Sequence, residues 1–200
     1  MDNKAMYQLT YGLFVLSAKD GDKDNGCIIN TAGQVTTTPN RITIAVNKQN
    51  CTHDMIRKTG EFNLSILDES APFAIFERFG FQCGRDTDKL AGLEVLRADN
   101  GLFYLKGHAS AFLSGKVVET MDLGTHTLFL ADVTDGALLS GDNPITYAYY
   151  QKNTKPKPEK TEKKGYRCKI CGYIYEGEPL PEDFICPICK HGAIDFEKII

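Results

Sequence analysis

The 200-residue sequence predicts a mainly β protein that carries a small metal-binding body near its C-terminal end. Short segments rich in β-branched and aromatic residues recur along most of the chain and are bounded by turn residues, which is typical of strands. Only two short segments have the start and stop signals of helices. Many short strands with few helices favour a barrel or a sandwich over a βαβ fold. Two C-x-x-C pairs account for the metal-binding body.

Five segments have the length and composition of strands. Each is short and rich in residues with high strand propensity. These segments are Phe14–Ala18, Ile42–Val46, Phe62–Ile66, Phe103–Leu105 and Leu128–Val133. The run Asp20–Gly26 is rich in Asp, Asn and Gly, and we expect it to form a turn or the end of a hairpin.

The two predicted helices lie between these strands. The first begins near Thr52, a good N-cap, and stops at Gly60, a good C-cap position. The second begins at Ser70, has Pro72 inside its first turn, and stops at Gly80.

The composition limits the classes of function. Hydrophobic residues make up 42% and charged residues 24% of the chain, and the formal net charge is −3, which is typical of a soluble globular protein. Nucleic acid is not an expected partner, because phosphate binding needs a basic face. No apolar run approaches the roughly 20 residues that span a bilayer. The polar start of the chain lacks the pattern of a secretion signal. We therefore expect a cytoplasmic protein that does not bind a membrane.

Residues 151–164 are predicted to link two domains. The segment contains six lysines, two prolines and no apolar side chain, so burial cannot offset the entropy lost on ordering it. We expect an extended, solvated tether, although a basic segment can also bind an acidic partner. The predicted division is a domain at residues 1–150, the linker, and a small body at 165–200.

Four of the seven cysteines form two knuckles of the form C-x-x-C. The knuckle residues are Cys168, Cys171, Cys186 and Cys189. Four thiolates at this spacing can converge tetrahedrally on one metal ion. A body this small cannot fold by burial alone, so we expect the metal to hold it together. The remaining cysteines have no partner spacing and are interpreted as small buried residues. They are Cys27, Cys51 and Cys83.

The spacing alone leaves structural zinc and redox iron open, because zinc ribbons use nearly the same spacing. Aromatic residues around the knuckles favour iron, since an apolar shell limits water access and tunes a redox potential. These residues are Tyr166, Tyr173, Tyr175, Phe184 and Phe196. Gly172 follows the first knuckle, where a positive φ lets backbone N–H groups point at the sulfurs.

The tail resembles rubredoxin over about residues 165–198. The segments Cys168–Tyr175 and Pro181–Cys189 follow the two signatures of that family. The resemblance implies one iron bound by the four knuckle cysteines. The stretch between the knuckles is shorter than in free-standing rubredoxins, as it is in trimmed modules fused to other redox proteins. Lys190 stands where the family usually has glycine, so this lysine must accept a positive φ or use a different turn.

Three polar clusters in the first domain are candidates for a flavin site, whereas motifs for a Rossmann nicotinamide site, a P-loop or a zinc protease are absent from the sequence. Asn30–Pro39 is dense in hydroxyl, amide and small residues, which bring backbone groups close to a ligand. Asn47–Thr52 leads into a helix N-terminus that suits a phosphate. Gly80–Lys89 offers Arg85 and Lys89 to an anion. A polar loop, a plain helix cap and a surface turn are the alternative interpretations.

Taken in order, these clusters resemble the flavin reductase-like, FMN-binding split-barrel family over about residues 5–150. The motifs are Thr10–Gly12, Cys27–Ala32, Thr36–Pro39, Asn47-Lys48, Thr52-His53, Cys83–Lys89, Asp122–Phe129 and Pro144–Tyr147. The resemblance implies a split β-barrel with FMN at the interface of a homodimer. The residues implied to bind FMN are Asn30, Thr31, Ala32, Gln34, Val35, Thr36, Thr37, Asn47, Lys48, Asn50, Thr52, Cys83 and Lys89. Cys83 replaces a serine that is common at its position.

His126 stands at the start of an apolar strand, where a histidine is often structural. The family resemblance implies instead a catalytic residue near the flavin face where hydride or electrons enter.

A flavin domain tethered to rubredoxin resembles the high molecular weight rubredoxins of anaerobic bacteria. This resemblance implies electron transfer from NAD(P)H, directly or through an NAD(P)H-dependent reductase, by way of FMN and iron. The implied acceptor is a flavodiiron protein that reduces oxygen or nitric oxide. Two alternatives stay open, namely a flavin reductase that releases reduced flavin and a zinc-ribbon binding protein without a redox role.

Overall fold

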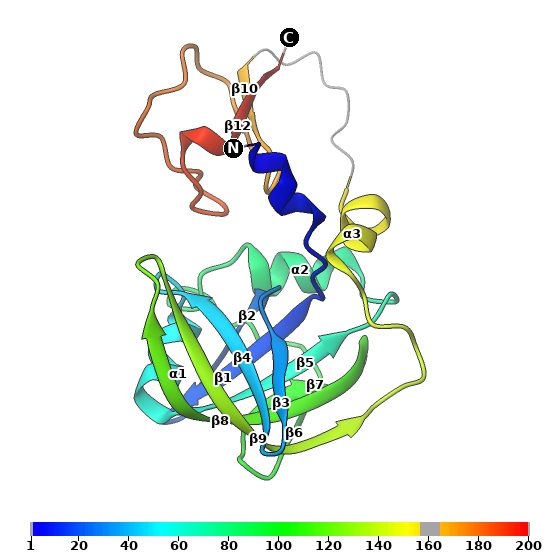
Figure 1. The fold of residues 1–200 in the computed structure, drawn as a ribbon. Helices are drawn as coiled ribbons and strands as arrows, with labels where there is room; N and C mark the ends of the chain where they lie inside the picture. Colours follow the sequence, from blue (N-terminus) through cyan, green and yellow to red (C-terminus); the bar gives the residue numbers. More distant parts are fainter. Residues whose placement is uncertain (1, 157–164, 200) are drawn as a thin grey trace.

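The computed structural model describes residues 2–156 and 165–199, which form a large β-sheet body and a small C-terminal body (Figure 1). The large body consists of η1 (Asn3–Gln8), β1 (Phe14–Asp20), β2 (Lys23–Ile29), β3 (Gly33–Thr37), β4 (Asn40–Asn47), α1 (Cys51–Thr59), β5 (Glu61–Leu67), α2 (Phe73–Gly80), β6 (Val95–Arg97), β7 (Phe103–Leu105), β8 (Ala109–Asp122), β9 (His126–Leu138), α3 (Tyr147–Tyr149) and η2 (Tyr150–Thr154). The small body consists of β10 (Gly165–Cys168), β11 (Ile174–Tyr175), η3 (Ala193–Asp195) and β12 (Phe196–Ile199). The predicted mainly β architecture is confirmed.

The large body is built on one seven-stranded sheet. Its strand order is β2-β1-β5-β8-β9-β4-β3, and neighbouring strands pair antiparallel. The long strands β8 and β9 form a hairpin in the middle of the sheet. β2 and β3 form its two edges in the described part of the chain.

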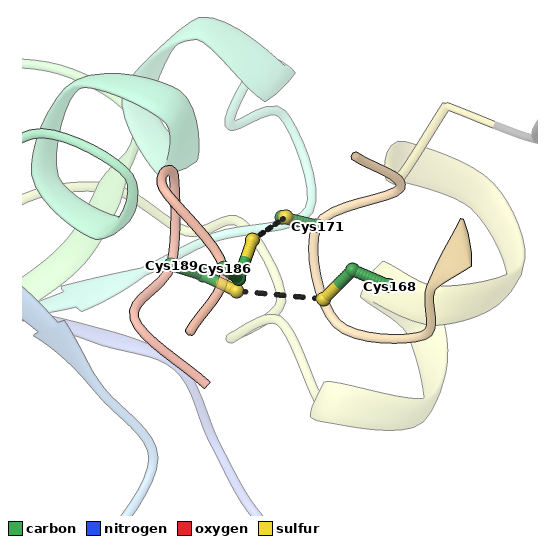
Figure 2. A group of neighbouring side chains, drawn as sticks. All are labelled: Cys168, Cys171, Cys186 and Cys189. Atoms are coloured by element: carbon green, nitrogen blue, oxygen red, sulfur yellow. Dashed lines mark hydrogen bonds between the residues drawn. The ribbon is translucent and has the colours of Figure 1, made fainter. Parts of the chain in front are cut away.

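The C-terminal body contains a three-stranded sheet of order β11-β10-β12. Cys168 is the last residue of β10, and the remaining knuckle cysteines lie in loops. Figure 2 shows the four cysteine side chains pointing toward one another from the two loops. The small sheet therefore positions the first knuckle.

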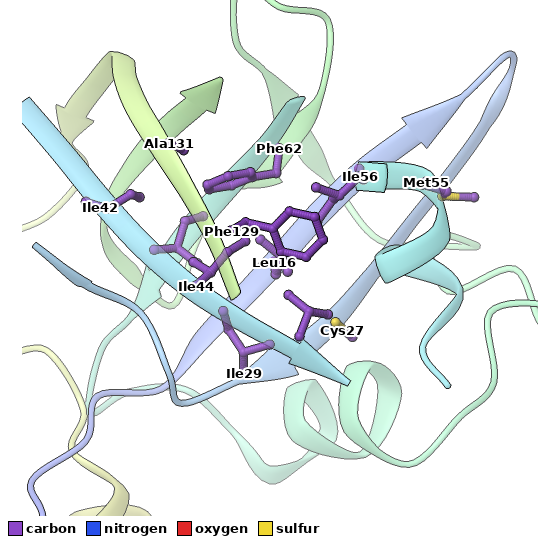
Figure 3. Close-up of a cluster of buried hydrophobic side chains, with 13 residues drawn as sticks. Leu16, Cys27, Ile29, Ile42, Ile44, Met55, Ile56, Phe62, Phe129 and Ala131 are labelled. Carbon is purple, nitrogen blue, oxygen red and sulfur yellow. The ribbon is translucent and has the colours of Figure 1, made fainter. Parts of the chain in front are cut away.

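The sheet of the large body curls around one hydrophobic core. Buried side chains of the edge strand β2 meet those of β4, although four strands separate β2 from β4 in the sheet order. Cys27 and Ile29 come from β2, and Ile44 comes from β4 (Figure 3). Phe62 and Phe129 fill the middle of this core and are fully buried. This closure is the split barrel that the resemblance implied.

A second cluster packs α2 against the outside of β1 and β7. Phe79 of α2 stacks on Phe103 of β7 with ring centroids 6.2 Å apart. Phe76 of α2 contacts Tyr150 with centroids 4.5 Å apart. This packing fixes the end of α2 and hence the loop that follows Gly80.

Both predicted helices are present, but their first turns differ from the prediction. α1 ends as predicted, with Gly60 in the left-handed region at φ 74°. Its N-cap is Asn50 rather than Thr52, which is the second residue of the helix and accepts a hydrogen bond on its hydroxyl from Asn25 of β2. α2 begins at Phe73 rather than Ser70, since the backbone N–H and hydroxyl of Ser70 both donate to Asp68.

All five predicted strand segments lie within strands of the structure. Within the large body, β2, β3, β6 and β8 were not predicted. The expected turn over Asp20–Gly26 is shorter, because Asp20 already pairs with Lys23 and β2 begins there.

Residues 151–154, which the sequence assigned to the linker, belong to η2. Residues 157–164 of the predicted linker lie outside the described residues. Within the described ranges, no helix combines the length and the apolar character needed to cross a membrane.

Candidate functional site

The four knuckle cysteines form a compact donor set. Their sulfur atoms all lie within 4.8 Å of one another. The Sγ atoms of Cys168 and Cys189 are 3.5 Å apart, as are those of Cys171 and Cys186 (Figure 2). A tetrahedral ion with metal–sulfur bonds of about 2.3 Å separates its sulfur ligands by about 3.8 Å. The arrangement therefore fits one ion bound by four thiolates.

Both knuckles use the same backbone turn. The N–H of Gly172 donates to the carbonyl of Cys168, and the N–H of Lys190 donates to that of Cys186, each at 2.9 Å. Gly172 has φ 81° and Lys190 has φ 61°. The prediction of a positive φ at Gly172 is confirmed. Lys190 adopts the same left-handed conformation, at a cost of roughly 1–2 kcal/mol for a residue with a Cβ.

Burial and the close approach of the cysteines raise the pKa of two of their thiols. Burial raises the pKa of the Cys168 thiol, and the neighbouring Cys189 raises that of Cys171 far above its usual range. The thiols of Cys168 and Cys171 would therefore keep their protons at neutral pH, and a metal ion that binds the cluster must displace these protons.

The aromatic shell expected around the knuckles is present. Phe184 lies at its centre, with its ring centroid 4.7 Å from Tyr175 and 5.3 Å from Phe196. Tyr166 and Tyr173 belong to the same cluster. Cys168 and Cys186 are buried, whereas Cys171 and Cys189 are half-buried. Water thus has limited access to the site, as a redox iron would need.

A cavity of about 470 Å³ lies between the barrel and the second knuckle. This volume suits a cofactor-sized ligand. The cavity is lined by Asn25, Cys27, Asn47, Gln49, Asn50, Cys51, Thr52, Gly80, Phe81, Gln82, Cys83, Gly84, Arg85, Asp86, Lys89, Pro187, Ile188, Cys189 and Lys190. It therefore joins a thiol of the metal centre to two of the three predicted flavin clusters.

The N-terminus of α1 forms one wall of this cavity. Asn50, its N-cap, has an extended backbone and no side-chain capping hydrogen bond. Gln49, Asn50, Cys51 and Thr52 all line the cavity. The positive end of the α1 dipole and its backbone N–H groups are therefore available to an anion, as the sequence predicted.

A second wall is held in place by Asn25. Its Nδ2 donates to Oγ1 of Thr52 at 2.9 Å, and its side chain is 2% exposed. A Cβ on Gly84 would lie 2.0 Å from Oδ1 of Asn25. Only glycine allows the loop after α2 to approach β2 this closely.

The two cations predicted to bind an anion are already bonded within the barrel. Lys89 is 5% exposed, and its Nζ donates to the carbonyls of Gly26 and Phe79 at 2.9 and 3.3 Å. Burial lowers the pKa of Lys89. The Nη1 of Arg85 donates to the Gln49 carbonyl at 2.8 Å and its Nη2 to Asp54 at 2.7 Å.

The Asp54 carboxylate forms hydrogen bonds with the side chains of His53 and Arg85. Its Oδ1 lies 3.1 Å from Nδ1 of His53, and its Oδ2 accepts from Arg85. These hydrogen bonds, that of His53 first, hold the pKa of Asp54 below its usual range. The pair fixes Arg85 beside the first turn of α1.

The three cysteines outside the knuckles meet at this cavity. The interpretation as small buried residues holds for Cys27, which is 4% exposed and whose pKa is raised by burial. It fails for Cys83, which is exposed, and Cys51 is half-buried. The tertiary fold brings these three cysteines together, and their spacing in the sequence does not predict it.

The structure brings five predicted flavin-site residues together around the cavity and places the others elsewhere. The five are Asn47, Asn50, Thr52, Cys83 and Lys89. Ala32 and Gln34 line a separate cavity of about 360 Å³. Thr31 donates through its hydroxyl to the Ala45 carbonyl at 2.6 Å. Asn30, Val35, Thr36 and Thr37 line neither of these two cavities.

Lys48 and His126 also lie outside the 470 Å³ cavity. The Nζ of Lys48 donates to Asp122 at 2.7 Å, and this bond lowers the pKa of the Asp122 carboxyl. His126 pairs with Asn47 across β9 and β4, and its Nδ1 is 2.8 Å from the Thr125 hydroxyl. Both residues therefore sit at the barrel end near the cavity rather than in its wall.

Sequence reasoning missed Asn25 and residues 187–190 as parts of this site. Asn25 lay in a run that resembled a turn. At Lys190, the sequence predicted either a positive φ or a different turn next to a cysteine ligand. That prediction indicated backbone strain and did not indicate that Lys190 lines the cavity.

Comparisons with known proteins agree with this architecture. The flavin reductase like domain matches residues 6–157, and the rubrerythrin, rubredoxin-like domain matches residues 166–197. The chain is 39% identical to a high molecular weight rubredoxin of Moorella thermoacetica, with 100% of each chain covered. It is 34% identical to a ferric-chelate reductase (NAD(P)H) of Archaeoglobus fulgidus, covering 80% of this chain and 95% of that relative. It is 27% identical to a putative diflavin flavoprotein of Nostoc sp., covering 70% of this chain but 24% of the longer protein.

The fold is also found among solved structures. The NADH:FAD oxidoreductase SgcE6 of Streptomyces globisporus superposes with a TM-score of 0.64 at 18% identity, covering 72% of this chain and 84% of that chain. This similarity shows the barrel fold, and the family matches and the four-thiol centre show the cofactors, a flavin of the FMN kind and iron. The chain therefore belongs to the high molecular weight rubredoxins, flavin-dependent oxidoreductases in which a flavin reductase-like domain is joined to a C-terminal rubredoxin-like domain.

Proposed function

We propose that this protein carries electrons from NAD(P)H to a redox partner through FMN and the iron centre. NAD(P)H reacts either directly or through a separate NAD(P)H-dependent reductase. One observation carries the proposal: Cys189, a ligand of the metal centre, lines the same cavity as Thr52 in the first turn of α1. An electron leaving a flavin in this cavity would meet a metal-bound sulfur without crossing solvent.

The residues of the cavity divide into two proposed roles. Asn47, Asn50 and Thr52 would face the phosphate side of FMN, and Cys83 and Lys89 line the same cavity. A bound flavin supplies two-electron reduction by a nicotinamide and single-electron delivery to iron. Lys89 orients the wall by holding two carbonyls, and Asn25 holds Thr52 in place.

The remaining family-implied contacts belong to the dimer that we propose. Asn30–Ala32 precede the edge strand β3, Gly33–Thr37, and every residue of β3 is exposed. Val35 of β3 is 51% exposed and Met121 of β8 is 59% exposed, and a second copy would cover apolar side chains of this kind. In a homodimer, the Asn30–Thr37 segment, Lys48 and His126 would complete the flavin site, with His126 as the catalytic residue near the flavin face.

The proposed donor and acceptor rest on the relatives. The name of the Archaeoglobus relative, a ferric-chelate reductase (NAD(P)H), supports a nicotinamide donor. The Nostoc relative is a diflavin flavoprotein of which this chain covers 24%, so a related domain occurs there within a longer flavoprotein. This supports a flavodiiron-type acceptor for oxygen or nitric oxide. We further propose a cytoplasmic location and domains at 1–150 and 165–200 joined by a linker at 151–164.

The test is an anaerobic reduction of the full chain loaded with FMN and iron. NADH, with a reductase added in a second arm, should bleach the flavin band and then the iron–thiolate band. After the NADH is consumed, a flavodiiron protein supplied with nitric oxide should restore both bands. A flavin band that bleaches while the iron band stays unchanged would contradict the proposal. Cys186→Ser removes one iron ligand and should abolish transfer to the acceptor, while FMN still binds to the barrel residues that line the cavity.

A flavin reductase that releases its product is the second candidate, and the Archaeoglobus relative favours it. A desalting column separates the two candidates, since the carrier retains FMN and the reductase loses it. A zinc-ribbon protein would be colourless after purification, whereas the iron protein is red when oxidised.

A further inference from the structure

Three cationic side chains line the cavity, and two of them are already paired. Arg85 is bonded to Asp54, and Lys89 is buried on two backbone carbonyls. The third is Lys190, which comes from the C-terminal body. Unlike Arg85 and Lys89, Lys190 could therefore bind a phosphate in the cavity without losing a hydrogen bond to a described residue.

Lys190 differs from Arg85 and Lys89 because its side chain is available to an anion. Its side chain is exposed and makes no hydrogen bond or ion pair with any described residue. It follows Cys189 directly and holds φ 61°, a conformation in which glycine would be unstrained. Nothing in the metal centre uses its side chain, because the turn needs only its backbone N–H.

The rest of the wall increases the need for such a cation. Among the described residues, Asp86 is the one carboxylate that lines the cavity, and its charge opposes an incoming phosphate. The cavity is also lined by the N-terminus of α1, whose N-cap side chain makes no capping bond. The dipole and Lys190 therefore face the same space from two separate bodies.

We propose that Lys190 is a binding residue for the phosphate group of a nucleotide in the cavity. This inference rests on the proposed function, because it takes FMN as the main nucleotide. The C-terminal body thereby contributes a binding residue to the flavin site of the barrel. The bound phosphate holds the iron-binding loop Pro187–Lys190 over the cavity. The phosphate of a nicotinamide nucleotide offers the same chemistry, and the test separates the two sources.

The test compares FMN with riboflavin, which has the same ring system and no phosphate. Dissociation constants are measured by flavin fluorescence on the full, iron-loaded chain at low ionic strength. Lys190→Ala removes the charge and keeps the Cβ, whereas Lys190→Gly also removes the backbone strain. Lys190→Arg keeps the charge, and Lys152→Ala removes an exposed lysine that does not line the cavity.

Both Lys190→Ala and Lys190→Gly should weaken FMN binding about three- to tenfold, as expected for one partly exposed ion pair. Neither variant should change riboflavin binding, and the effect should shrink as salt is added. Lys190→Arg should restore FMN affinity, and Lys152→Ala should leave it unchanged. The iron–thiolate spectrum should be the same in all variants, since no ligand changes.

Three results would overturn the inference. These are unchanged FMN affinity in Lys190→Ala, an equal loss of FMN and riboflavin affinity, and recovery of FMN affinity in Lys190→Gly. If NADPH instead lost affinity while FMN did not, the phosphate would belong to the nicotinamide nucleotide and the assignment to FMN would be wrong. Failure of the proposed function looks different, because then the iron band would not bleach although FMN affinity responds to Lys190.

Discussion

Asn25 donates a hydrogen bond of 2.9 Å from Nδ2 to Oγ1 of Thr52 and so ties β2 to the first turn of α1. Both residues are buried, at 2% and 0% exposure, although they face the wall of the cavity. The bond takes the Thr52 hydroxyl away from helix capping and leaves the α1 N-terminus open to a ligand.

Replacing Asn25 with alanine should lower the free energy of unfolding by about 1–3 kcal/mol, because the buried Thr52 hydroxyl loses its partner. FMN binding should weaken in parallel, since the first turn of α1 is no longer anchored. Urea unfolding of the iron-loaded chain, followed by circular dichroism, measures the first effect. Asn153→Ala, at an exposed position, is the control and should change stability by less than about 0.5 kcal/mol.

Gly84→Ala should disrupt the cavity, because its Cβ would lie 2.0 Å from Oδ1 of a side chain that cannot move freely. The expected cost is about 1–3 kcal/mol of stability together with a clear loss of FMN affinity. Gly141→Ala is the matched control, since a Cβ there meets nothing within 4 Å. Equal behaviour of the two variants would contradict the close packing of this loop on β2.

Alkaline pH should destabilise the protein in part through Tyr150. Burial, and secondarily Tyr147, raises the pKa of Tyr150 from 10.0 to about 12. A raised folded-state pKa means that the unfolded chain loses this proton first, so the stability is present below pH 10 and is lost between pH 10 and about 12. Between pH 10 and about 12, the free energy of unfolding of Tyr150→Phe should fall by on the order of 1–2 kcal/mol less than that of the unchanged protein. Urea unfolding at stepped pH provides the measurement, and parallel curves for both proteins would refute it.

Cys83 should react with iodoacetamide well before Cys27. Cys83 is exposed at the cavity mouth, whereas Cys27 is 4% exposed and burial raises its pKa, which reduces the thiolate fraction. FMN should slow the alkylation of Cys83, because both occupy the same cavity. Peptide mapping by mass spectrometry reads out each site in the iron-loaded chain. Cys83→Ser should retain FMN, and its labelling pattern should differ only at that position.

The local parts of the site could be predicted from the sequence. The spacing of the four cysteines was sufficient to predict their convergence, because a C-x-x-C turn is a self-contained structure. Gly172 and Gly60 were recognisable for the same reason, since each terminates a local motif with positive φ. The resemblance to known families added the split barrel and the flavin.

The relations between distant segments could not be predicted. Asp24 and Asn25 resemble turn residues, and only the pairing of β2 with β1 reveals that Asn25 is buried. Lys89 has the charge of a phosphate ligand, but the fold directs it to carbonyls of β2 and α2. No local pattern indicates that the second knuckle covers the cavity of the barrel.

The loop Pro187–Lys190 belongs to the metal centre and to the wall of the flavin cavity at once. Thermodynamic reciprocity then applies: if a flavin makes docking of the iron module more favourable, docking tightens flavin binding by the same factor. Removal of the flavin should therefore weaken docking of the iron module on the barrel. Removal of the iron should in turn weaken flavin binding, although no bond joins the two cofactors.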